Sequence, residues 1–174
     1  MDGFVADALH EFRRHKELAE RAMARLSDDA FFERPGEAVN SVALVGKHLT
    51  GNLKSRWTDL LTTDGEKPWR NRDNEFAITD ADTREQLMAA WEEGWQVVLD
   101  TVGSLQPSDL DKSITIRGEQ HTVTQALIRG MTHAAYHVGQ ITYLARLLEP
   151  EGEWLTIAPG NSTAQRGEYR KREL

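Results

Sequence analysis

The sequence predicts an all-α protein, an antiparallel four-helix bundle with a short β-hairpin before the last helix and a long loop between the second and third helices. Three observations predict this fold. Four segments repeat apolar residues at the spacing of one helix face. Two of these segments begin with the spacing of a capping box, which marks a helix start. A single Ile-Thr-Ile run at 114–116 is the strand signal, and it is too short to build a sheet.

The first two helices are expected over residues 2–26 and 41–61. Pro35-Gly36 closes the connection between them. Asn40 or Ser41 provides the N-cap of the second helix. The apolar stripe of the first helix comprises Val5, Leu9, Phe12, Ala19, Met23 and Leu26, and that of the second comprises Val42, Val45, Leu49, Leu53 and Leu60.

The third and fourth helices have the clearer boundaries. Asp82 with Glu85 has capping-box spacing and predicts the start of the third helix, which ends before Pro107. Thr122 with Gln125 predicts the start of the fourth, which ends before Pro150. Between them, the run at 114–116 and the turn at 117–119 predict the hairpin. The segment 62–82 is too long for a plain bundle connection, so we expect it to cover a site or contact a partner.

Composition limits the class of protein. The 174 residues predict one domain over 1–163 with a charged C-terminal tail over 164–174. A net charge of −7 makes nucleic acid an unexpected partner. With no cysteine, the chain has no disulfide, thiolate ligand or cysteine nucleophile. No apolar run is long enough to span a membrane and the N-terminus does not resemble a signal peptide, so we expect a cytoplasmic protein.

Three histidines are candidate metal ligands. His133 and His137 are four residues apart and share the inward face of the fourth helix, and His48 lies at the edge of the apolar face of the second. Imidazoles that converge from two helices can form an open metal site. The alternatives stay open: the pair could bind backbone carbonyls, and His48 could lie on the surface. His15 is a weaker candidate ligand, and His121 weaker still.

The second helix also carries a polar stripe within its apolar side. Asn52 and Arg56 follow His48 at one and two turns, which makes them candidate catalytic or ligand-binding residues: Asn52 would orient a ligand, and Arg56 would meet an anionic group. Alternatively, Arg56 pairs with Asp59 or with acidic residues of the long loop. The glycines at 46, 51 and 130 indicate either close helix packing or space for a ligand.

At these residues the sequence resembles the DinB-like superfamily of bacterial four-helix bundles. The similarity rests on His48, on the Thr-His-Ala-Ala-Tyr-His-Val-Gly-Gln-Ile run at 132–141 and on the hairpin. It spans nearly the whole chain. The segments at 51–59, 63–73 and 154–162 are similar to a subgroup of unassigned function.

The resemblance implies a divalent metal, such as Zn, Ni or Fe, held by His48, His133 and His137. It also implies relatives that are thiol-dependent transferases or isomerases using a low-molecular-weight thiol. We therefore expect a metal-dependent enzyme acting on a small molecule, by thiol transfer, isomerisation or hydrolysis. The alternative is a non-catalytic metal-binding or stress-related bundle.

Two further expectations concern partners. The substrate or thiol cofactor is expected to be anionic, with Arg56 and Arg70 binding its carboxylate and Arg72 joining them if the loop folds over the site. A homodimer is expected because Trp91 and Trp95 are expected on nearly opposite sides of one helix, which leaves apolar surface for a second copy.

Overall fold

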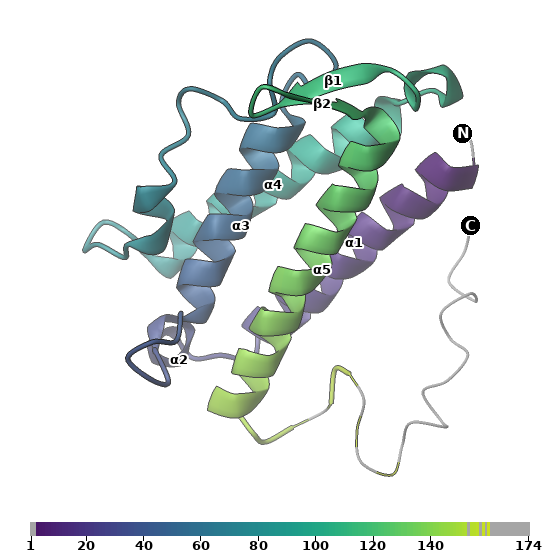
Figure 1. Ribbon diagram of the computed structural model, residues 1–174. Helices are drawn as coiled ribbons and strands as arrows, with labels where there is room; N and C mark the ends of the chain where they lie inside the picture. Colours follow the sequence, from purple (N-terminus) through teal and green to yellow (C-terminus); the bar gives the residue numbers. More distant parts are fainter. Residues whose placement is uncertain (1–2, 153, 157, 159, 161–174) are drawn as a thin grey trace.

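The computed structural model describes residues 3–152, 154–156, 158 and 160, and four long helices form its body (Figure 1). The predicted tail, 164–174, lies outside the described residues. The elements in chain order are α1 (Gly3–Met23), α2 (Asp28–Phe32), α3 (Val42–Trp57), η1 (Asp73–Phe76), α4 (Arg84–Ser104), η2 (Pro107–Asp109), β1 (Ser113–Ile116), β2 (Glu119–Thr122) and α5 (Val123–Leu148). The predicted four-helix bundle with one hairpin and one long loop is confirmed, and the short α2, η1 and η2 are additions to it.

The long loop between α3 and α4 determines the relative direction of these two helices. α3 ends beside the hairpin, and the loop then carries the chain back to the end of the bundle where α3 began (Figure 1). Lys47 near the start of α3 accordingly binds Asp82, just before α4, and Thr101 near the end of α4 binds the carbonyl of Trp57. α3 and α4 therefore run in the same direction, while α1 with α4 and α3 with α5 are the antiparallel neighbours.

Aromatic side chains fill the centre of the bundle. Phe12 packs edge-on against Trp57 and Trp95, with ring centroids 5.3 and 6.4 Å apart. Trp91 and Trp95 are both buried and their rings are 5.5 Å apart. Their placement on opposite sides of the helix was wrong, because residues four apart share a helix face. These two side chains therefore leave no surface for a second copy.

Side-chain caps mark the helix starts. Ser41 caps α3, and the Thr122–Gln125 capping box begins α5, both as predicted. The predicted Asp82–Glu85 box was wrong. Thr83 caps α4 with Gln86 one residue later, because the Asp82 carboxylate is occupied by Lys47 and Thr79.

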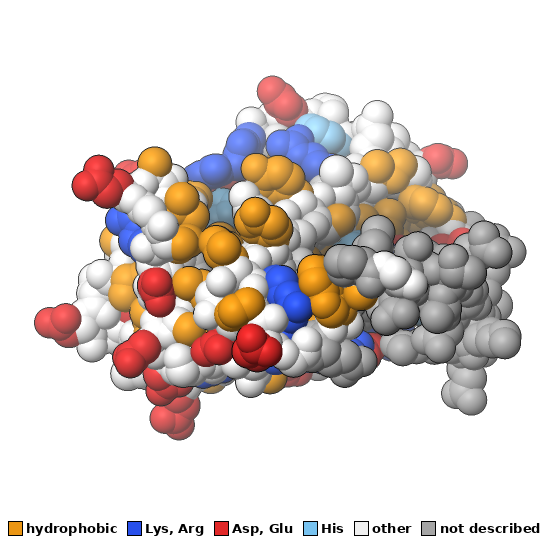
Figure 2. Space-filling model, turned by 90° about the horizontal axis from the view of Figure 1, so that it is seen from below, with side chains coloured by type: hydrophobic (Ala, Val, Ile, Leu, Met, Phe, Trp, Pro, Cys, Tyr) orange, Lys and Arg blue, Asp and Glu red, His pale blue; other side chains and the backbone are white. Residues whose placement is uncertain are grey.

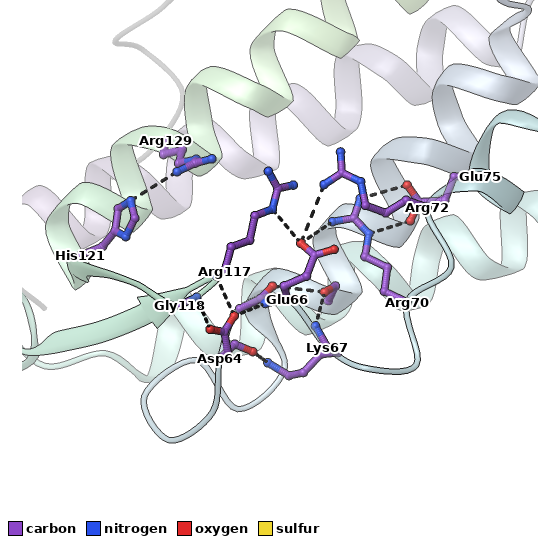
Figure 3. A network of polar contacts seen from close by, with 12 residues as sticks. Asp64, Glu66, Lys67, Arg70, Arg72, Glu75, Arg117, Gly118, His121 and Arg129 are labelled. Carbon is purple, nitrogen blue, oxygen red and sulfur yellow. Dashed lines mark hydrogen bonds and ion pairs between the residues drawn. The ribbon is translucent and has the colours of Figure 1, made fainter.

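The hairpin is fastened to the long loop through one carboxylate. β1 and β2 pair antiparallel from Ser113–Thr122 to Ile116–Glu119. The two turn residues, Arg117 and Gly118, have φ values of 57° and 76°, as the tight turn of a two-residue hairpin requires. Asp64 accepts hydrogen bonds from the backbone N–H groups of both turn residues at 2.9 Å (Figure 3). The loop and the turn are therefore held as one unit.

Among the described residues, no helix has both the length and the apolar character that crossing a membrane requires.

Candidate metal and ligand site

The three candidate histidines come together between α3 and α5. Their potential ligand nitrogens all lie within 4.8 Å of one another, and within the described residues they form the one such cluster of potential metal ligands. The Nε2 atoms of His133 and His137 are 3.2 Å apart. Two nitrogens bound at about 2.0–2.1 Å to one tetrahedral ion would be separated by about 3.3 Å. The spacing of this pair therefore fits a shared ion.

Hydrogen bonds orient two of the three imidazoles. Nδ1 of His48 donates to the Glu75 carboxylate at 2.9 Å, and Nδ1 of His137 donates to the Gln140 amide oxygen at 2.8 Å. In each ring the proton on Nδ1 leaves the Nε2 lone pair available for a metal. Nδ1 of His133 is buried and has no hydrogen-bond partner within the described residues. Two imidazoles with Nε2 left available, and a third whose Nε2 lies 3.2 Å from that of His137, fit a divalent ion.

Burial keeps the pair on α5 neutral. It lowers the pKa of His133 to about 3, and the charges of His137, His48 and two arginines add to the effect. Burial also lowers the pKa of His137, although the hydrogen bond to Gln140 opposes this. Neutral imidazole is the form that binds metals, so these two side chains are in the ligating state at neutral pH.

The long loop supplies two residues that the sequence did not single out as site residues. Glu75 of η1 is buried against His48, and Phe76 stacks on the His48 ring with centroids 4.7 Å apart. Gly51 makes room for Glu75, because a Cβ at position 51 would lie 2.7 Å from the carboxyl carbon. Burial raises the pKa of Glu75, but hydrogen bonds from His48 and Arg70 outweigh it and bring the pKa below its ordinary value. The long loop therefore lies against the histidine cluster.

Arg70 holds the loop carboxylates. Its Nε and Nη2 atoms donate to the two oxygens of Glu75 at 2.7 and 2.9 Å, and Nη1 donates to Glu66 at 3.4 Å (Figure 3). The side chain is 1% exposed. The sequence predicts that Arg70 binds an anionic ligand. In the structure Arg70 instead contacts two carboxylates, and these contacts favour a role in positioning Glu75.

A cavity of about 230 Å³ adjoins the histidines. His48 and His133 form part of its wall, and Asn52 lies beside them as predicted. Its other polar lining comes from four arginines, Arg56, Arg72, Arg117 and Arg129. Figure 2 shows Lys and Arg side chains gathered beside histidines at one edge of the visible face, whereas acidic side chains are spread over the whole face.

Arg56 is buried in the cavity wall, and no acidic residue in the described part of the chain forms an ion pair with it. The residue is 5% exposed, and its Nη1 atom has no hydrogen-bond partner within the described residues. Pairing with Asp59 or with loop acids is therefore not observed; Glu75, one of those acids, binds His48 and Arg70 instead. Burial, with the charges of Arg129 and Arg117, lowers the pKa of Arg56 to about 10, so it remains a cation.

The remaining candidates lie outside the cluster. His15 is buried in α1, with its pKa lowered by burial and by Arg14. His121 in β2 accepts a hydrogen bond from Arg129 at 3.3 Å. Arg117 and Arg129 were missed as cavity residues. Turn and helix patterns place them on their elements, but the sequence does not show that both elements border the same cavity.

Known proteins similar to this chain share its fold. A protein-family model described as "protein of unknown function" (DUF1572) matches residues 2–161. YjoA of Bacillus subtilis, whose structure is described as DinB-like, is 17% identical over 85% of this chain and 95% of its own, with a TM-score of 0.66. A conserved protein of Enterococcus faecalis is 16% identical over 87% of this chain and 100% of its own, also with a TM-score of 0.66. No curated protein matches. The chain therefore has the DinB-like fold and belongs to the DUF1572 family.

Proposed function

We propose that the protein binds a divalent metal ion through His48, His133 and His137 and is a metal-dependent enzyme acting on a small anionic molecule. The observation that carries the proposal is the convergence of three imidazoles, with ligand nitrogens within 4.8 Å of one another, at the wall of an arginine-lined cavity. Zn, Ni and Fe all suit imidazole ligands. A structural metal site is closed by protein ligands, whereas three histidines beside a cavity leave a position for substrate.

The residues around the histidine cluster have different roles. Glu75 fixes the ring orientation of His48, and Gln140 fixes that of His137. Asn52 orients the substrate, and Arg56 holds its negative charge. A divalent ion there would supply Lewis-acid activation of a water or a thiol. Because the chain has no cysteine, a thiol nucleophile would come from a low-molecular-weight thiol cofactor.

The test compares metal-loaded and metal-free protein purified without an affinity tag. Both forms would be assayed with a panel of small thiols plus electrophiles and with a panel of hydrolysable esters and amides. We expect turnover in one panel by the metal-loaded form only. Asn52→Ala should reduce that turnover without changing metal content. Full metal content with no turnover in either panel would favour the alternative, a non-catalytic metal-binding bundle.

A further inference from the structure

An unpaired cation in the cavity wall indicates the kind of group that the cavity binds. Arg56 of α3 is 5% exposed and lines the cavity, and its Nη1 atom has no hydrogen-bond partner within the described residues. Its side chain packs against Gly65, where a Cβ would lie 3.1 Å from Cδ and 3.2 Å from Nη1 of Arg56. Burying an unpaired charge is costly, so a side chain held this way is suited to an anion that enters from outside the chain.

The other arginines of the cavity are only partly neutralised. Glu66 lies within ion-pair distance of Arg117 at 3.1 Å and of Arg72 at 3.9 Å, and it also accepts from Arg70 (Figure 3). One carboxylate is thus shared by three cations. Neither Arg56 nor Arg129 has a carboxylate partner in the part of the chain that the structure describes, so a charge of at least +2 remains beside the histidines.

The position of Arg117 is a second, independent sign of a binding role. Its φ of 57° lies in the left-handed region, where glycine or asparagine is the usual residue of a hairpin turn. The turn N–H groups are already bonded to Asp64. An arginine here is unfavourable for the backbone, and it adds a guanidinium group to the cavity wall.

We propose that the cavity binds the dianionic phosphoryl group of a small phosphorylated molecule, through Arg56 and Arg129 with Arg117 and Arg72, so that the rest of the molecule faces the histidines. This inference rests on the proposed function for the identity of the reacting site. A monocarboxylate would neutralise one of the two arginines that have no carboxylate partner among the described residues, whereas a phosphoryl dianion matches both and offers three acceptor oxygens. A volume of about 230 Å³ is enough for a phosphoryl group and a few further atoms.

The test uses calorimetric titration of the full chain, at about pH 8 where phosphate is mostly dianionic. Inorganic phosphate, methyl phosphate and acetate are the probes. We expect both phosphates to bind more tightly than acetate. Arg56→Met, which keeps an apolar stem of similar length, should weaken phosphate binding by about tenfold to a hundredfold. Because it removes a buried unpaired cation, the same change should not lower the melting temperature.

The matched control is Arg84→Met. Arg84 lies in α4 away from the cavity, where it binds the carbonyls of Met23 and Leu26 and the Asp28 carboxylate. This variant should lose stability and keep phosphate affinity. The proposal would be overturned if acetate bound as tightly as phosphate, or if Arg56→Met left phosphate affinity unchanged. The assignment to a phosphate ester would be overturned if phosphate bound and methyl phosphate did not.

All titrations would be repeated with metal-free protein. Phosphate binding that persists without metal supports the arginine site even if no metal-dependent activity is found. Metal binding without phosphate binding overturns the arginine site and leaves the metal proposal standing.

Discussion

Gly51 provides a way to test the role of Glu75 without changing Glu75 or any histidine. Gly51→Ala would place a Cβ 2.7 Å from the Glu75 carboxyl carbon and closer still to Oε1. The carboxylate cannot simply swing aside, because Arg70, whose side chain is 1% exposed, holds both of its oxygens. The substitution should therefore break the 2.9 Å contact between Glu75 and His48.

Two opposing effects determine the size of the change. Alanine is better than glycine inside a helix by about 1 kcal/mol. Losing a hydrogen bond to a charged group costs about 1.5–3 kcal/mol. The expected net destabilisation is about 0.5–2 kcal/mol, and removing the carboxylate that orients a ligating histidine should weaken metal binding by about tenfold to a hundredfold.

Gly46 in the same helix is the matched control. A Cβ there would have no neighbouring atom within 4 Å, so Gly46→Ala should stabilise the protein by about 1 kcal/mol and leave metal affinity unchanged. The assays are thermal unfolding of the metal-free proteins and zinc titration against a competing chelator. If the two alanine variants had the same stability and zinc affinity, Glu75 would have no role in orienting His48.

Two further predictions concern the hairpin and the surface. Hydrogen bonds from the backbone N–H groups of Glu66, Gly118 and Arg117 lower the pKa of Asp64, although burial opposes them slightly. Its contribution to stability is therefore present above the unfolded pKa of about 4 and is lost as the pH falls through the lower folded value. Asp64→Asn should lower the free energy of unfolding by about 1 kcal/mol at neutral pH, as urea unfolding would show, and the difference should vanish in acid; a difference that persists in acid would contradict this. The homodimer stays a prediction, and its better candidate surface is the outer side of α5, where Tyr136, Tyr143 and Leu147 are 63%, 71% and 53% exposed. Light scattering should give a dimer mass for the wild type and for Leu61→Glu in the loop after α3, and a monomer mass for Tyr143→Glu; a monomeric wild type at micromolar concentration would refute the dimer.

Local signals were sufficient for much of the fold. The Thr122–Gln125 box marked the start of α5 because both of its hydrogen bonds join residues that are only three apart in the sequence. The same spacing at Asp82 was misleading, because the Asp82 carboxylate binds Lys47, which is distant in the sequence. Thr83 caps α4 instead. A local pattern therefore fails where a distant partner competes for the same side chain.

Some residues of the site could likewise be predicted from local sequence, whereas others depend on distant parts of the chain. His133 and His137 share a helix face by spacing alone, and His48 was placed by its position in the apolar pattern of α3. Glu75 could not be assigned to His48, because its partner depends on the path of the loop between α3 and α4. Gly51, three residues after His48 on a buried helix, was the signal that something approaches there, although a glycine does not identify what approaches it.

The metal content of the untagged protein tests the central claim most directly. Elemental analysis after equilibration with zinc and removal of free ions should give about one ion per chain for the wild type and almost none for His133→Ala. The circular dichroism of the variant should remain helical, because the buried core does not depend on the ion. A wild type without bound metal, or a His133→Ala variant that retains it, would contradict the account.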